Sequence, residues 1–269
     1  MSDLIEHGPQ QDLRISLVQT ELVWQQQQAN RDRLAELLQP LAGQSDLIVL
    51  PEMFTSGFSM APEQVAEPVD GPTTDWLRQQ AAELGAAITG SVATDLGGRY
   101  CNRLLFVSPQ GEVQYYDKWH LFRMAGEHQH YQAGERRVIF GYRGWRILPL
   151  ICYDLRFPVF SRNRQEYDLL LCVANWPQPR RHPWRTLLQA RAVENLCYVA
   201  GVNRVGEDGN QLPYSGDSML VDFKGEPLID RPAGQPFIES TALSAGQLAA
   251  FREKFPAWLD ADPFVLGDG

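Results

Sequence analysis

Five polar or ionisable residues stand where apolar runs of the sequence end. Glu52 follows the run LIVL and a proline, Cys152 follows RILPLI, and Lys118 follows VQYY and an aspartate. Asn175 and Asn203 stand in the same way after LLLCVA and YVAGV. Ligand sites of α/β sheets form at the carboxyl ends of the strands. We therefore expect these five side chains to line one pocket, although polar residues also end strands simply because loops begin there.

A cysteine, a carboxylate and a lysine together make a complete set for acyl transfer. A thiol is a weak nucleophile until a base removes its proton, and a carboxylate can be that base. Attack on a carbonyl carbon builds negative charge on oxygen, which a fixed ammonium group can stabilise. The usual partner of a nucleophilic cysteine is histidine, and the chain has five: His7, His120, His128, His130 and His182. Spacing alone leaves a Cys–His pair and a Cys–Glu–Lys triad both open.

The elements that must position these residues are short apolar runs that alternate with helical stretches. Strands are predicted at 15–19, 46–50, 86–93, 103–108, 113–116, 146–151, 168–174, 197–202, 218–221, 227–229 and 238–242, and helices at about 25–41, 73–84, 183–196 and 244–254. Several runs are apolar on both faces, as in strands that are covered on both sides. The segment RLLFVSPQGEVQYYD reads as a hairpin, and the proline-rich residues 62–72 read as a surface loop. The pattern predicts an α/β fold with two sheets packed face to face and helices outside.

Length and composition favour one domain of 1–269 that needs neither a disulfide nor a metal to fold. The 269 residues are 44% hydrophobic, and the net charge is −9. An acidic chain is a poor partner for nucleic acid or an anionic membrane, and no apolar run approaches the roughly 20 residues of a membrane span. The N-terminus MSDLIEHGPQQD is too polar for a signal peptide. Four cysteines without a CxxC motif favour free thiols and a cytoplasmic location.

Five motifs surround the candidate chemistry. They are PEMFTSGFS at 51–59, YDKWHLF at 116–122, PLICYDLRFP at 149–158, ANWP at 174–177 and ARAVEN at 190–195. This set resembles the nitrilase superfamily of carbon–nitrogen hydrolases, and within it the small omega-amidases, or 2-oxoglutaramate amidases. The resemblance runs from about Leu13 to about Pro263.

The resemblance implies a four-layer αββα sandwich with a defined set of roles. Glu52 would be the general base, Lys118 the cationic stabiliser and Cys152 the nucleophile. Glu127, in GEHQHYQAGE, occupies the place of the family's second glutamate, and the backbone N–H of Tyr153 would be the second oxyanion donor. The resemblance further implies a homodimer formed through the helical layer and no cofactor. The C-terminal segment REKFPAWLDADPF is a candidate to wrap the neighbouring subunit.

The resulting hypothesis is an amidase that acts on a small omega-amido 2-oxo acid. It would hydrolyse the terminal amide to acid and ammonia through a cysteine thioester. The alternatives are another small amide, an N-carbamoyl amino acid or a nitrile as substrate, or a non-catalytic binding protein on the same fold. The sequence holds no GxxxxGK[ST], no GxGxxG after a strand and no GxSxG, which argues against phosphate-binding and serine-hydrolase functions.

The substrate side of the pocket has several candidates. Phe54, Asn175 and Trp176 could wall it, and Arg156 could face a substrate carboxylate. A structural ion pair of Arg156 with Asp154 or Glu194 is favoured over that role. Its rivals for the carboxylate are Arg180, Arg181, Arg185 and Arg204.

Other conspicuous residues are predicted to be structural. His128 and His130 form HxH close to His120 and Glu127, but a zinc site needs three or four ligands in a suitable geometry, so loop packing or a pocket wall is favoured and no metal is expected. Cys101, Cys172 and Cys197 read as small buried hydrophobes. Arg191 and Glu194 are three residues apart on a predicted helix, where they can form an ion pair.

Overall fold

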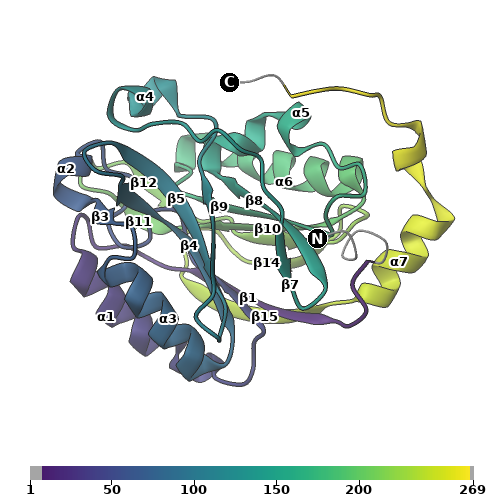
Figure 1. Cartoon of the computed structure of the whole chain (residues 1–269), viewed down its shortest axis with the longest axis horizontal. Helices are drawn as coiled ribbons and strands as arrows, with labels where there is room; N and C mark the ends of the chain where they lie inside the picture. The colour runs from purple at the N-terminus through teal and green to yellow at the C-terminus, as the bar shows by residue number, and fades with distance from the viewer. Residues whose placement is uncertain (1–7, 267–269) are drawn as a thin grey trace.

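Two β-sheets face each other in the computed structural model shown in Figure 1, which describes residues 8–266. The first sheet has the strand order β15-β1-β2-β4-β5-β6, with β3 paired to β4. Its strands are β1 (Leu13–Gln19), β2 (Leu47–Val49), β3 (Glu67–Pro68), β4 (Ala87–Asp95), β5 (Tyr100–Val107), β6 (Val113–Asp117) and β15 (Phe237–Leu243). β1, β2 and β4 are parallel, while β5, β6 and β15 join as antiparallel strands.

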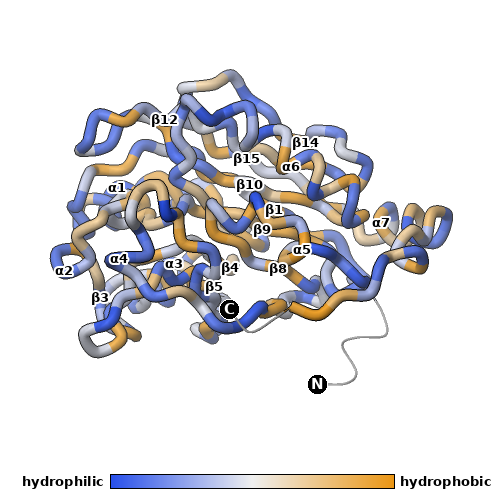
Figure 2. The backbone as a smooth tube through the Cα atoms, turned by 90° about the horizontal axis from the view of Figure 1, so that it is seen from above, coloured by the Kyte–Doolittle hydropathy of each residue, from blue (hydrophilic) through white to orange (hydrophobic). Residues whose placement is uncertain are grey.

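The second sheet has the order β14-β13-β10-β9-β8-β7, and a separate two-stranded hairpin pairs β11 with β12. These strands are β7 (Phe140–Tyr142), β8 (Trp145–Ile151), β9 (Leu169–Ala174), β10 (Tyr198–Asn203), β11 (Val205–Glu207), β12 (Pro213–Ser215), β13 (Met219–Val221) and β14 (Pro227–Asp230). The central strands β8, β9 and β10 are parallel and almost wholly buried. Figure 2 shows hydrophobic stretches concentrated along them.

Helices cover the outer faces of both sheets, so the layers run αββα as predicted. The helices are α1 (Gln27–Leu38), α2 (Pro62–Val65), α3 (Pro72–Leu84), α4 (Glu127–His130), α5 (Pro158–Ser161), α6 (Arg181–Asn195) and α7 (Ala245–Lys254), and the 3₁₀ helices are η1 (Gln39–Leu41), η2 (Arg123–Ala125), η3 (Cys152–Arg156), η4 (Gln178–Arg180) and η5 (Ala257–Asp260). α1 and α3 pack on the first sheet and α6 on the second (Figure 1). No helix in the described part of the chain is long and apolar enough to cross a membrane.

The main core lies between the sheets and joins their inward side chains. Ile15 and Phe106 from the first sheet belong to the same buried cluster as Leu148 and Leu170 from the second. A second cluster, which includes Leu34 and Leu77, lies between the first sheet and its helices. Because each apolar strand is covered on both faces, it needs no polar alternation, which explains the continuous runs in the sequence.

The predicted elements are confirmed, with shifts of up to three residues at their ends, and the predicted hairpin is β5–β6. The prediction missed four short strands, β3, β7, β11 and β12, because two or three residues carry too little periodicity to be recognised. The prediction of a loop at 62–72 was wrong in part, since this segment contains α2 and β3. The N-terminal segment, which was predicted not to be a signal peptide, falls mainly on residues 1–7 and includes His7. These residues lie outside the part of the chain that the structure describes.

Candidate active site

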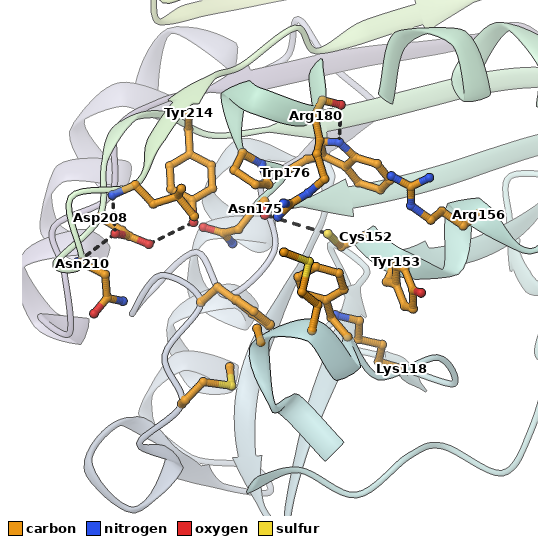
Figure 3. A pocket seen from close by; sticks show the side chains of 17 residues that line it. Lys118, Cys152, Tyr153, Arg156, Asn175, Trp176, Arg180, Asp208, Asn210 and Tyr214 are labelled. Atoms are coloured by element: carbon orange, nitrogen blue, oxygen red, sulfur yellow. Dashed lines mark hydrogen bonds between the residues drawn. The ribbon is translucent and has the colours of Figure 1, made fainter. Parts of the chain in front are cut away.

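Strand ends from both sheets meet at one cavity of about 360 Å³, shown in Figure 3. Lys118 follows β6 of the first sheet, while Cys152 and Asn175 follow β8 and β9 of the second, and all three line the cavity. Glu52, three residues after β2, lies fully buried behind this wall. Four of the five strand-end residues predicted from sequence are therefore brought together.

Lys118 is clamped between two buried carboxylates. Its Nζ donates to Oε1 of Glu52 at 3.0 Å and to the carboxylate of Glu127 at 3.0 Å, and all three side chains are inaccessible to solvent. The second carboxylate oxygen of Glu127 accepts a hydrogen bond from the backbone N–H of Phe122 at 2.5 Å. The ammonium position is thus fixed from two sides.

The charges in this cluster shift one another. Burial by itself lowers the pKa of Lys118, but the carboxylates of Glu127 and Glu52 outweigh burial, and the net shift is upward. Burial raises the pKa of Glu127, and the nearby Lys118 ammonium offsets only part of that shift. Lys118 is therefore a permanent cation at neutral pH.

Glu52 is oriented by two amides that approach it from different sheets. Nδ2 of Asn102 on β5 donates to Glu52 Oε1 at 2.8 Å, and the backbone N–H of Asn175 donates to Oε2 at 2.7 Å. Nδ2 of Asn175 also donates to the Glu52 carbonyl at 2.5 Å. Asn102 was not predicted as a site residue, although an asparagine directly before the apolar run of the predicted strand was a signal for it.

Cys152 begins η3 directly at the end of β8 and is partly exposed in the cavity. Its φ of +48° is in the left-handed region, which residues other than glycine rarely adopt. This conformation marks a sharp change of chain direction at Cys152. Burial, followed by the Glu52 carboxylate, raises the pKa of the thiol well above its usual value. The resting state is therefore a neutral thiol near an acceptor carboxylate.

The turn that carries Cys152 is held by Asp154, which is fully buried. One carboxylate oxygen accepts from the Ile151 N–H at 3.0 Å and the Tyr116 hydroxyl at 2.8 Å. The other accepts from the His120 N–H at 2.9 Å and lies 2.8 Å from His120 Nδ1. Asp154 is thus occupied by the turn itself and does not pair with Arg156.

The structural ion pair predicted for Arg156 is wrong. Glu194 pairs with Arg191 at 2.8 Å, as its spacing on α6 predicted, so neither proposed acid reaches Arg156. The Arg156 guanidinium instead lies 5.0 Å over the Trp176 ring, and both side chains line the cavity. Arg156 therefore presents its positive charge to the cavity.

Phe54 is not brought into the cavity. It is completely buried between the first sheet and α3, where its ring centroid lies 5.9 Å from that of Trp76. Gly90 on β4 makes room for it, because a Cβ there would lie 2.7 Å from the Phe54 ring. Met53, with φ of +42°, turns the chain between Glu52 and Phe54 and directs the ring to the opposite side of the sheet.

Asn203 supports the cavity wall without lining it. Its Oδ1 accepts the Trp176 N–H at 2.8 Å, and its Nδ2 donates to the Trp176 carbonyl at 2.9 Å. The rest of the wall is largely apolar and comes from segments that the sequence analysis did not assign to a site. It includes Phe58, Met60, Phe122, Met124, Ala125, Leu212 and Tyr214, with Asp208 and Asn210 at one side.

The histidines of the described chain do not contribute to the cavity lining. His120 stacks on Phe157 at 3.8 Å and is bound to Asp154, whereas His128, His130 and His182 are exposed. Within residues 8–266, no three histidine, cysteine, aspartate or glutamate side chains are grouped so that they could hold a metal ion. Cys101, Cys172 and Cys197 are buried, as predicted.

Comparisons with known proteins agree with this geometry. The sequence model described as "Carbon-nitrogen hydrolase" matches residues 14–253. The chain is 51% identical to "Omega-amidase YafV" of Escherichia coli (strain K12) over 94% of this chain and 98% of that protein. It is 29% identical to "2-oxoglutaramate amidase" of Bacillus subtilis (strain 168), over 91% and 96% of the two chains. Among solved structures, XC1258 from Xanthomonas campestris, described as a CN-hydrolase superfamily protein with an arsenic adduct in the active site, has a TM-score of 0.92 at 55% identity and covers 95% of this chain and 99% of its own.

Proposed function

Because this chain belongs to the carbon-nitrogen hydrolase family, we propose that it is an omega-amidase. Its substrate is a small omega-amido 2-oxo acid such as 2-oxoglutaramate, and its products are the acid and ammonia. The observation that carries the proposal is the position of Cys152 in a cavity whose wall contains Lys118, with Glu52 and Glu127 buried behind it. The family match and the named relatives support an enzyme that cleaves linear amides.

In the first step, Glu52 takes the proton of Cys152 as the sulfur attacks the amide carbon. A C–S bond forms, and the carbonyl electron pair moves to oxygen. The Lys118 ammonium and the backbone N–H of Tyr153 stabilise this oxyanion, and one such donor is typically worth about 10²–10³ in rate. Glu127 acts by holding Lys118 in place.

In the second step, protonated Glu52 gives its proton to the amide nitrogen, and the C–N bond breaks to release ammonia. A thioester on Cys152 remains. Glu52 then takes a proton from water as the water oxygen attacks the thioester, and cleavage of the C–S bond returns the thiol and the acid product.

Arg156, Asn175 and Trp176 form the substrate side of the cavity in this proposal. The Arg156 guanidinium pairs with the substrate carboxylate, for which arginine has a matching planar fork of donors. The ring of Trp176 beneath it keeps the guanidinium in one orientation. Asn175 holds Glu52 in place against the cavity wall through its backbone and side-chain hydrogen bonds.

We also propose that the chain forms one hydrolase domain, works in the cytoplasm and assembles as a homodimer. Four free cysteines fit a reducing compartment. Large apolar side chains are exposed on α6 and in the C-terminal segment, where Val193 is 53% exposed, Phe255 55% and Leu259 74%. Burial of such side chains against a second copy would remove them from water.

Ammonia release from a substrate panel tests the function. We expect the highest kcat/KM on 2-oxoglutaramate or a similar omega-amido acid, and lower values on a nitrile and on an N-carbamoyl amino acid. Cys152→Ala should abolish turnover while circular dichroism remains unchanged, and a slow variant should show an acyl adduct on the peptide that contains Cys152. A nitrile or carbamoyl preference would reassign the substrate, and an adduct on another cysteine would refute the nucleophile.

A further inference from the structure

Five arginines were candidates for the anion of a substrate, and three of them are committed elsewhere. Arg181 pairs with Asp217 at 2.6 Å and is exposed outside the cavity lining. Arg185 pairs with Asp217 and, at 2.7 Å, with Asp230. The buried Arg204 donates to the backbone carbonyls of its surroundings, with its guanidinium 4.8 Å over Tyr214. Only Arg156 and Arg180 of these five line the cavity.

Arg180 reaches across the cavity from one wall to the other. Arg180, labelled in Figure 3, ends η4, after β9. Its guanidinium lies 5.3 Å over the ring of Phe122, which belongs to the segment after β6. The backbone is fixed at the same residue, because the Trp176 Nε1–H donates to the Arg180 carbonyl at 2.7 Å. Both ends of the side chain are therefore positioned.

The charge of Arg180 has no acidic partner among the described residues. No carboxylate there lies within 4.0 Å of its guanidinium, and the same holds for Arg156. The acid of the cavity wall, Asp208, is used inside its own turn, where it accepts from the N–H groups of Asn210 and Leu212 and from the Tyr214 hydroxyl. Aromatic faces thus fix both guanidinium groups, which leaves their N–H donors available to a ligand.

The buried cluster behind Cys152 offers an entering anion little attraction. It holds two carboxylates, Glu52 and Glu127, and both accept from the single ammonium of Lys118. The cation nearest the nucleophile is therefore already paired. The positive charge that attracts a substrate anion must then come from the two guanidinium groups that line the cavity.

Resting on the proposed function, we infer that Arg180 is a second carboxylate-recognising residue, which with Arg156 makes the cavity select anionic amides over neutral ones. The two arginines grip the carboxylate and the adjacent oxygen of a 2-oxo acid from opposite sides. The reacting amide then lies at Cys152. Selection is therefore for a short chain with an amide at one end and an anion at the other.

The test compares anionic and neutral amides in matched variants. For Arg180→Gln, we expect kcat/KM to fall about 10- to 100-fold on 2-oxoglutaramate and succinamate, mainly through KM, as befits the loss of a charge-assisted hydrogen bond. Turnover of neutral butyramide should stay within about twofold of wild type. Arg180→Lys should recover part of the loss on the anions. Arg181→Gln, at the neighbouring position but paired outside the cavity, is the control and should leave all three substrates within about twofold.

The outcomes separate this inference from the proposed function. An equal loss on anionic and neutral amides, or no loss on either, would overturn the inference and leave the amidase in place. A wild-type enzyme that cleaves butyramide but neither anion would instead refute the omega-amidase proposal itself.

Discussion

At the scale of the residue, the site depends on a neutral thiol rather than on a preformed thiolate. Many reactive cysteines have a lowered pKa, but Cys152 has a raised one, because burial and the Glu52 carboxylate both disfavour the charged sulfur. In the proposed mechanism the proton must therefore leave during attack, with Glu52 as its acceptor. Without a substrate, the thiol should react slowly with small electrophiles.

Alkylation of Cys152 by iodoacetamide in the free enzyme should consequently rise with pH. Below the thiol pKa, the thiolate fraction grows about tenfold per pH unit, so the logarithm of the rate should climb without a plateau between pH 6 and 9. Peptide mass spectrometry would assign the modified cysteine. A plateau below pH 7 would show that the thiolate is already formed, contrary to this view.

Glu127→Gln should expose the contribution of the second carboxylate. This carboxylate is the largest of the charges that raise the pKa of Lys118, so its loss should lower that pKa. The alkaline limb of the kcat/KM profile should then move to lower pH, and kcat should fall roughly 10²-fold because Lys118, the proposed oxyanion donor, loses its position. The exposed Glu135, changed to glutamine, is the matched control. An unshifted alkaline limb would show that Glu127 does not set the pKa of Lys118 in the working enzyme.

At the scale of the element, the turn from β8 into η3 is the part that must be rigid. Asp154 gathers four donors from Ile151, Tyr116 and His120, and these tie the turn to β6 and the segment that follows it. Asp154→Asn would place an NH₂ group against at least one of these donors. We expect the free energy of unfolding to drop by about 2–4 kcal/mol and kcat to drop with it.

Denaturant unfolding and kcat measured on the same preparation check this expectation. The partly exposed Asp95, which accepts from the Gly98 N–H in a surface turn, gives the matched control Asp95→Asn. Equal effects at the two aspartates would mean that the turn at Cys152 has no special need of its carboxylate.

Gly134 is a second constraint at this scale, because its segment passes close to the end of β6. A Cβ at Gly134 would lie 2.1 Å from the Asp117 carbonyl oxygen, and the Gly134 N–H donates to the Lys118 carbonyl at 2.8 Å. Gly134→Ala should displace Lys118 and reduce kcat about 10²-fold. Gly97→Ala is the control for backbone strain without a steric clash, because φ at Gly97 is +82° but a Cβ there would meet nothing within 4 Å.

The elements also show what the sequence could predict and what it could not. Apolar runs covered on both faces located the strands, and the polar residues at their ends identified Glu52, Lys118 and Cys152 as neighbours. The roles of Asn102 and Asp154 were not predicted because they depend on contacts between segments far apart in the chain, which local periodicity does not contain. Phe54 was placed in the pocket because it follows Glu52 closely, but the left-handed Met53 reverses its direction.

At the scale of the whole molecule, the exposed apolar side chains of α6 and the C-terminal segment predict a dimer. Light scattering should give twice the mass of one chain, and Leu259→Asp should shift the particle towards a single chain. The exposed Val69, changed to aspartate, lies in the loop before α3 and should have no such effect. A wild-type particle with the mass of one chain would contradict the assembly.

The proposed catalytic groups lie on both sides of the boundary between the two sheets, with Glu52 and Lys118 on one side and Cys152 on the other. The distances from Glu52 and Lys118 to Cys152 therefore depend on how the two sheets are packed against each other. A shift of about 1 Å of one sheet relative to the other would leave every strand folded, yet such a misplacement of reacting groups can lower the rate about 10²-fold. On warming, the enzyme should therefore lose its activity at a lower temperature than its native circular dichroism. The difference between these two temperatures would measure how firmly the two sheets are packed together.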